Sequence, residues 1–277
     1  MLKLGLLQHR LRRHDGWAAW QAALAANIAE AAAAGAQLLV LPEYAAMDAI
    51  AAPLASLADE LAAACDLHDA IVDTMRALTA RHGVWLLGGS LPVRRDGAVI
   101  NHAPLIAPDG HVTWQDKHRT TRFEGEAWGV TGGAPPRTFD TPWGRIGVCI
   151  CYDAEFPPLA RAQVADGAWL LLVPACTDTL AGFNRVCLSA RARAVENQCF
   201  VAMATTVGDA PFIASMDCGH GHAAVFGPPD RGFPDDGVVA RGPMDTQGWL
   251  YTTLDPARIA AVRRDGAVLN HRDYPPC

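Results

Sequence analysis

Residues 144–165 read GRIGVCICYDAEFPPLARAQVA and contain a strand pattern, a turn and a helix pattern in direct succession. The apolar run that ends at Ile150 predicts a buried strand over Gly144–Ile150. The pair Pro157-Pro158 predicts a helix that continues through Ala165. Cys151 follows the strand directly, at the edge where ligands bind in open α/β sheets. The segment therefore predicts an α/β fold with a thiol at its functional edge.

The same alternation of strand and helix patterns runs through the rest of the chain. Its expected strands are Leu2–Gln8, Leu38–Leu41, Val84–Gly89, Trp169–Val173 (stopped by Pro174), Cys199–Ala204, Ala223–Phe226, Val238–Arg241 and Trp249–Leu254, with a hairpin of Ala98–Ala107 and His111–Gln115. The expected helices cover about residues 17–35, 66–82 and 184–197. Strands that are apolar throughout are covered on both faces, so the pattern predicts a layered α/β domain.

Composition narrows the class of protein. The chain has 277 residues, of which 51% are hydrophobic and 19% charged, and it shows no repeat or linker, so we expect one domain over 1–277. A net charge of -6 gives no general attraction to nucleic acid. The start of the chain lacks a signal-peptide pattern, and no apolar run is long enough to span a membrane. Eight cysteines, mostly within apolar patterns, are expected to be reduced thiols of a cytoplasmic protein.

Three reactive side chains each follow the end of an expected strand: Glu43, Lys117 and Cys151. A carboxylate can activate the thiol, and an ammonium can stabilise the oxyanion that forms when the thiol attacks an amide. Each residue alone has an ordinary interpretation, since Glu43 could cap a helix, Lys117 could be solvated and Cys151 could be a packed thiol. The chemical hypothesis depends on the three residues together.

Cys149 and Cys151 are two residues apart, so the choice of nucleophile needs an argument. Cys149 lies between Val148 and Ile150 inside the expected strand, where a neutral packed thiol is expected. Cys151 precedes a turn in which backbone N–H groups become free, and these groups, with a nearby cation, favour a thiolate. We therefore favour Cys151.

Four segments resemble the nitrilase superfamily of carbon–nitrogen hydrolases, in the family's order. They are Leu39-Val40-Leu41-Pro42-Glu43, Asp116-Lys117-His118, Gly147 through Pro157, and Ala192 through Gln198. The resemblance covers Met1 to about Gly208, and Asp209–Gly242 matches less well.

The resemblance implies a four-layer αββα sandwich that pairs in homodimers. It also implies hydrolysis of a linear, non-peptide amide through a thioester, without metal or organic cofactor. In that scheme Glu43 is the general base, Cys151 is the nucleophile, and Lys117 with the Tyr152 N–H holds the oxyanion. A second glutamate near the lysine is typical of the family. We favour Glu126 over Glu124 from its distance to the following Gly132-Gly133 turn.

Several alternatives stay open. The same triad fits a nitrile or N-carbamoyl hydrolase, and the same fold could serve as a non-catalytic scaffold. A papain-like site would need His118 or His102 as its base. The cluster Cys218-Gly219-His220-Gly221-His222 lacks further ligands at zinc-site spacings, so we expect a rim loop there and no metal.

Two further expectations concern surfaces. Residues that could line the substrate pocket are Tyr44, Trp128, Trp143, Phe183 and the loop Thr177–Gly182. Residues that could form a homodimer interface are Leu159, Val164, Val186 and Leu188, on the helices that follow the nucleophile. The sequence does not indicate which acyl or amine group the substrate carries.

Overall fold

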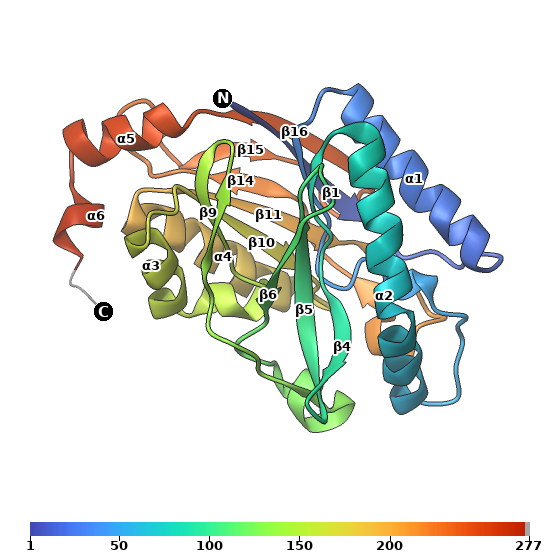
Figure 1. Ribbon diagram of the computed structural model, residues 1–277. Coiled ribbons are helices and arrows are strands. Elements are labelled where there is room, and N and C mark those ends of the chain that lie inside the picture. Colours follow the sequence, from blue (N-terminus) through green and yellow to red (C-terminus); the bar gives the residue numbers. More distant parts are fainter. Residues whose placement is uncertain (275–277) are drawn as a thin grey trace.

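The computed structural model describes residues 1–274, and its main sheet of 14 strands is curled and flanked by helices (Figure 1). The main path of hydrogen-bonded strands runs β4-β5-β3-β2-β1-β11-β10-β9-β8. These strands are β1 (Leu2–His9), β2 (Leu38–Val40), β3 (Trp85–Leu87), β4 (Leu91–Arg95), β5 (Ala98–Ile106), β8 (Thr138–Thr141), β9 (Gly144–Val148), β10 (Leu170–Ala175) and β11 (Phe200–Thr206). β6 (Val112–Asp116) and β7 (Val130–Thr131) pair with β5.

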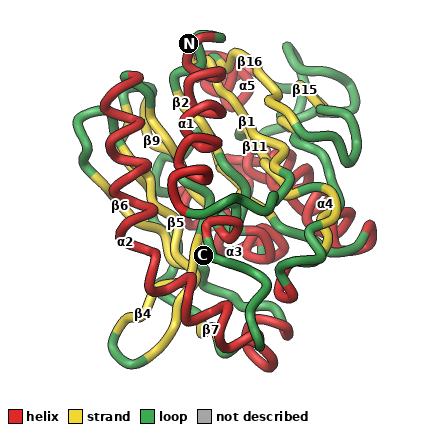
Figure 2. The backbone as a smooth tube through the Cα atoms, turned by 90° about the vertical axis from the view of Figure 1, so that its right-hand side faces the viewer, coloured by secondary structure: helices red, strands yellow, loops and turns green. Residues whose placement is uncertain are grey.

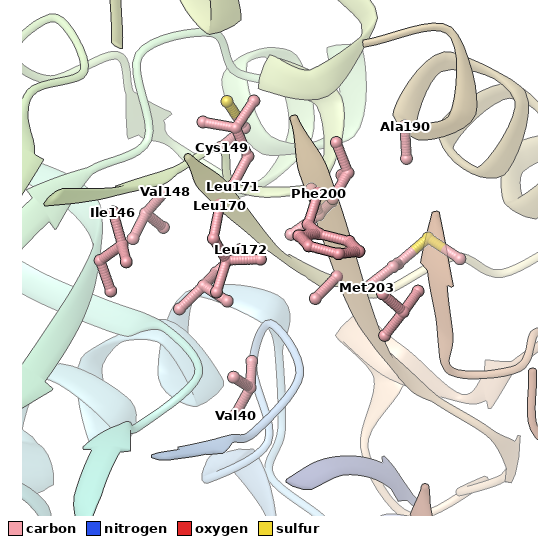
Figure 3. Packing of buried hydrophobic residues seen from close by; sticks show 14 of the residues in the cluster. Val40, Ile146, Val148, Cys149, Leu170, Leu171, Leu172, Ala190, Phe200 and Met203 are labelled. Atoms are coloured by element: carbon pink, nitrogen blue, oxygen red, sulfur yellow. The ribbon is translucent and has the colours of Figure 1, made fainter. Parts of the chain in front are cut away.

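The sheet divides into two halves between β1 and β11. These strands pair only at Gln8–Thr205 and His9–Thr206, so the halves are joined at one end. Side chains from both halves share one core cluster, in which Val40 of β2 lies with Val148 of β9 and Leu172 of β10 (Figure 3). The halves therefore face each other as two sheet layers.

Helices cover the outer faces of both halves. α1 (Trp17–Ala33) and α2 (Leu57–His82) lie side by side over the first half (Figure 2), where they share a second core cluster with Leu39 and Leu86. α3 (Pro157–Ala165) and α4 (Leu180–Asn197) pack on the second half, where Gln163 of α3 contacts Cys149. The order helix, sheet, sheet, helix confirms the expected αββα sandwich.

Most expected elements are present, and two differ for identifiable reasons. α2 begins at Leu57, well before Asp66, because Ser56 caps it by accepting a hydrogen bond from the N–H of Asp59. β10 continues through Pro174 instead of stopping there. β9 pairs with β10 only as far as Leu172, so the missing N–H of the proline leaves no ladder partner unpaired.

The C-terminal part completes both halves. β16 (Gly248–Leu254) runs antiparallel to β1, and β14 (Ala224–Phe226) connects β11 to β15 (Val238–Arg241). α5 (Pro256–Asp265) and α6 (Asn270–Asp273) follow, and the sequence patterns did not predict them.

The less similar segment after β11 folds against α2. It contains β12 (Gly208–Asp209), the short helix η4 (Ala214–Met216) and β13 (Cys218–Gly219). The buried carboxylate of Glu60 in α2 accepts hydrogen bonds from the N–H groups of Ala214 and Ser215, at 2.7 and 3.0 Å. This contact fixes the segment as one wall of the cavity described below.

Two chain-wide expectations can be compared with residues 1–274. No helix in this range is long and apolar enough to cross a membrane. The seven cysteines in this range are free thiols, and Cys277 lies outside the described residues.

Candidate active site

Glu43 lies three residues after β2, on a loop held against the start of β4. It forms an isolated bridge with Ser90, and the N–H of Tyr44 donates to the Ser90 carbonyl at 3.0 Å. A Cβ atom on Gly89 would lie 2.1 Å from the Pro42 carbonyl oxygen, so only glycine fits this close approach. The loop directs the Glu43 carboxylate into the protein, where the side chain is buried.

Lys117 follows β6 directly and is 1% exposed. Its Nζ donates to Oε1 of Glu43 at 2.8 Å and to Oε2 of Glu124 at 2.6 Å. An ammonium group has three protons, so one remains for a third acceptor.

The glutamate beside the lysine is Glu124, and the expectation of Glu126 is corrected. Both residues lie in the π-helical turn η2 (Phe123–Trp128), two positions apart and on different faces. Glu124 is 2% exposed, whereas the Glu126 side chain is 62% exposed and pairs with Arg122 at 2.8 Å. The distance to the Gly132-Gly133 turn carried no information about which face of this turn points inward.

Cys151 begins the short 3₁₀ helix η3 (Cys151–Glu155) with a left-handed φ of 46°. Its Sγ lies 3.6 Å from the carbonyl oxygen of Cys176, the residue after β10. Tyr152 is the second residue of η3, and the first N–H groups of a helix have no acceptor within it. Cys149, in contrast, is packed in the core, and its Sγ accepts from Gln163 Nε2 at 3.1 Å.

Asp153 connects the cysteine turn to the lysine loop. Its buried carboxylate accepts the N–H groups of His118 at 3.1 Å and Arg119 at 2.8 Å. Burial raises the pKa of Asp153 to about 6, against the opposing effect of these two N–H donors. The contact fixes the segment after Lys117 relative to Cys151.

One cavity of about 700 Å³ is lined by the side chains of four residues described above: Glu43, Lys117, Glu124 and Cys151. Its other lining residues are Tyr44, Thr121, Arg122, Phe123, Tyr152, Glu155, Cys176, Thr177, Asp178, Gly182, Arg185, Val186, Ala214, Ser215, Met216, Asp217 and Cys218. Tyr44 and part of the loop Thr177–Gly182 thus lie where the sequence placed them. Trp128, Trp143 and Phe183 do not line the cavity and pack elsewhere.

Glu43 and Glu124 share Lys117 but differ in their other hydrogen-bond donors. Glu124 also accepts from Tyr44 Oη at 2.6 Å and from the N–H and hydroxyl of Thr121 at 2.8 and 2.9 Å. Burial opposes its ionisation, but Lys117 and these donors outweigh burial and lower the pKa of Glu124. Burial, opposed by Lys117 and reinforced by the charge of Glu124, raises the pKa of Glu43 to about 7. Glu124 is therefore the fixed anion, and Glu43 is the group that can exchange a proton near neutral pH.

The surroundings of the Cys151 thiol raise its pKa and so favour the neutral form, from which a base has to remove the proton. Burial and then the charge of Glu43 raise the pKa of Cys151 well above 9.0, and Lys117 opposes this only in part. Burial also opposes the charge of Lys117, but Glu43 and Glu124 outweigh it and hold the pKa of Lys117 well above 10.5. The site at rest combines a neutral thiol, a permanent cation and a carboxylate poised to take a proton.

None of the histidines in the described part of the chain lines this cavity. His102 is buried with its Nδ1 2.6 Å from Asp116, and His118 Nδ1 lies 3.0 Å from the Gly133 carbonyl. Neither residue lines the cavity, so the papain-like alternative lacks its base.

The expected rim loop does reach the cavity, through Cys218. Its histidines point to separate partners, His220 to Asp245 and His222 to its neighbouring carbonyl. Within residues 1–274 no group of three or more His, Cys, Asp or Glu side chains is arranged to hold a metal ion.

Sequence reasoning missed two contributors to the site. Asn101 in β5 donates from Nδ2 to Glu43 at 3.0 Å and to Glu124 at 3.4 Å. The N–H of Cys176 donates to Oε2 of Glu43 at 3.1 Å. Asn101 reaches the site from a neighbouring strand, and Cys176 acts through its main chain, so side-chain patterns along the sequence did not reveal either.

The fold and site define an α/β protein with a buried carboxylate, ammonium and thiol at the ends of its strands. The chain belongs to the carbon–nitrogen hydrolase family, whose sequence model matches residues 3–264.

Individual relatives are similar to this chain over most of its length. The probable hydrolase YhcX of Bacillus subtilis is 35% identical over 196 residues, which cover 71% of this chain but only 38% of that protein. The omega-amidase NIT2 of Mus musculus is 30% identical over 201 residues, covering 68% of each chain. A structure of an amidase from Nesterenkonia sp. AN1, of the nitrilase superfamily, has a TM-score of 0.74 and 25% identity, and covers 99% of this chain and 97% of that one.

Proposed function

We propose that this protein hydrolyses the carbon–nitrogen bond of a small amide through a thioester on Cys151. The observation that carries the proposal is the shared cavity, in which Glu43, Lys117, Glu124 and Cys151 converge. A base with a pKa of about 7 beside a neutral thiol suits proton transfer at neutral pH.

In the first half of the proposed reaction, Glu43 removes the Cys151 proton while the sulfur bonds to the carbonyl carbon. The carbonyl electron pair moves onto oxygen, which accepts hydrogen bonds from the free proton of Lys117 Nζ and from the Tyr152 N–H. When the carbonyl re-forms, the carbon–nitrogen bond breaks. Glu43 gives its proton to the departing amine, and the thioester remains.

In the second half, Glu43 removes a proton from water, and the resulting hydroxide attacks the thioester carbon. Collapse of this intermediate breaks the carbon–sulfur bond and releases the carboxylic acid. Cys151 regains the proton that Glu43 holds. Glu124 stays ionised throughout and keeps Lys117 charged and oriented.

The relatives support an amide as the substrate. The mouse relative is named an omega-amidase, and a Synechocystis relative, 28% identical over 254 residues, is named a deaminated glutathione amidase. A structure of a mutant of the Nesterenkonia amidase shows covalent addition of the acetamide moiety of fluoroacetamide at the active-site cysteine of that protein. These names concern the relatives and do not fix the acyl group accepted here.

The test uses the two neighbouring cysteines as a matched pair. We expect Cys151→Ala to abolish ammonia release from a panel of amides with the fold intact, and Cys149→Ala to keep substantial activity while losing some stability. Nitriles and N-carbamoyl compounds of matched acyl groups, assayed in parallel, separate the related reactions. If Cys149→Ala loses turnover and Cys151→Ala keeps it, the assignment of Cys151 as the nucleophile is wrong. Wild-type inactivity together with no electrophile trapping would favour a scaffold.

We also propose a homodimer or a higher assembly built on dimers. Of the four residues expected at its interface, Val164 and Val186 are buried within the chain, and Leu188 of α4 is 64% exposed. Light scattering at micromolar concentration should give about twice the chain mass or an even multiple of it, and a monomer mass would contradict the proposal.

A further inference from the structure

Asn101 lies between the two carboxylates that share Lys117. It is 0% exposed, and its Nδ2 donates to Oε1 of Glu43 at 3.0 Å and to Oε1 of Glu124 at 3.4 Å. Its main-chain carbonyl accepts the N–H of Lys117 at 2.9 Å. This one residue therefore contacts the base, the fixed anion and the lysine.

The neighbours of Asn101 determine the orientation of its amide. The reverse orientation would place the amide oxygen against two carboxylates, which would repel it. In the observed orientation Oδ1 has no hydrogen-bond partner among the described residues, although it is buried. The Nδ2 donor is therefore the part of this side chain that acts on the site, and both of its acceptors are carboxylates of the site.

The two oxygens of Glu43 have different partners. Oε1 accepts from both Lys117 Nζ and Asn101 Nδ2, at 2.8 and 3.0 Å. Oε2 accepts the N–H of Cys176 at 3.1 Å, and the carbonyl oxygen of Cys176 lies 3.6 Å from Sγ of Cys151. The main chain of one residue, Cys176, thus contacts both Oε2 and the thiol, whereas Oε1 accepts from two side-chain donors.

We propose that Asn101 is a positioning residue that holds Oε1 of Glu43 and so leaves Oε2 to exchange the proton with Cys151. This inference rests on the proposed function, since it names the atom of the proposed base. Asn101 also stabilises the ionised form of Glu43, because a donor to a carboxylate favours the charged state. The residue acts through Glu43 and does not line the cavity itself.

The test compares Asn101→Ala with Asn197→Ala across the pH profile of kcat/KM. Asn197 is a matched control, since it is also 0% exposed, donates once, to the Arg193 carbonyl at 3.0 Å, and has an unpaired Oδ1. Loss of the donor raises the pKa of Glu43, so the acidic limb should move up by about one pH unit in Asn101→Ala. At pH 7 kcat/KM should fall about fivefold through kcat, because the ionised share of Glu43 falls, and most of the loss should be recovered at alkaline pH. Asn197→Ala should leave the limb in place.

A second variant and a second readout keep the test decisive. Asn101→Asp keeps the shape of the side chain and replaces the N–H donor, so the acidic limb of its kcat/KM profile should also move to higher pH. This variant serves as the test if Asn101→Ala does not fold. The rate of Cys151 alkylation by iodoacetamide against pH reports on Glu43 even where no amide is turned over, so it separates failure of this inference from failure of the proposed function. An unmoved acidic limb and an unmoved alkylation profile in a folded Asn101 variant would overturn the inference.

Discussion

One loop carries two buried carboxylates that face different parts of the molecule. Glu43 faces the catalytic cavity, and Asp48, five positions later, faces the segment that follows β1. They are 1% and 3% exposed, so burial alone does not distinguish them. Burial raises the pKa of Glu43 to about 7, whereas the pKa of Asp48 is lowered despite burial.

The difference lies in what surrounds each carboxylate. Asp48 accepts from Trp20 Nε1 at 3.0 Å, contacts His9 Nε2 and His14 Nε2 at 3.1 and 3.4 Å, and accepts the Arg12 N–H at 3.3 Å. No second carboxylate is among these partners. Glu43 shares the cation of Lys117 with Glu124, and the negative charge of Glu124 opposes the ionisation of Glu43. At Glu43 burial raises the pKa and the charge of Glu124 adds to this effect, whereas at Asp48 the surrounding donors outweigh burial.

The largest expected effect comes from replacing the base. Glu43→Gln removes the group assigned to proton transfer in both half-reactions, and a general base is typically worth on the order of 10²–10⁴ in rate. Deacylation needs the same base to activate water. Molecules of the Glu43→Gln variant that are slowly acylated should therefore accumulate as the thioester. Intact-protein mass spectrometry after mixing with a substrate amide should detect this adduct on Cys151.

Lys117→Ala should have a smaller and different effect. A lone oxyanion donor is typically worth about 10²–10³ in rate, and its loss slows acylation itself, so little adduct should be seen. Lys117→Arg should restore only part of the rate, because a broad planar guanidinium does not fit a compact ammonium site. If Lys117→Ala traps the thioester and Glu43→Gln shows none, the two roles have to be exchanged.

The next effect tests the competing anion, with Glu126→Gln as the matched control on the same turn. Glu124→Gln removes a charged partner of Lys117 and should lower kcat/KM about 10- to 100-fold. Removing its charge also removes a cause of the raised pKa of Glu43, so the acidic limb should move to lower pH. Glu126→Gln should change neither quantity, since the Glu126 side chain is 62% exposed, pairs with Arg122 and does not itself line the cavity. If Glu126→Gln moved the pH profile of kcat/KM, the sequence-based choice of Glu126 as the second glutamate would be supported instead.

Some residues of the candidate site could be predicted from the sequence, and others could not. Glu43, Lys117 and Cys151 were predicted because each follows a strand whose apolar pattern is visible, and strand ends meet at one edge of the sheet. The choice between Glu124 and Glu126 failed because the direction of each side chain depends on the irregular turn η2, which has no readable period. Asn101 was missed because its role comes from contacts across the sheet.

The smallest effect on activity is expected at Asp48, where the comparison predicts a structural role. Asp48→Asn keeps the shape but removes the charge that faces His9 and His14, and it should cost about 2–3 kcal/mol in the free energy of unfolding. The pKa of Asp48 is lowered in the folded state, so its contribution is present above the unfolded pKa of about 3.9 and is lost as the pH falls through the folded value. Urea unfolding at pH 7 should therefore show a lower midpoint for Asp48→Asn, and the gap to the wild type should narrow only in strong acid. At pH 7 kcat/KM should stay within about threefold of the wild type, because Asp48, His9 and His14 line a separate cavity, whose lining includes neither Lys117 nor Cys151. If Asp48→Asn instead moved the acidic limb of kcat/KM, the two carboxylates would be coupled through their loop, and their separation into a base and an anchor would be wrong.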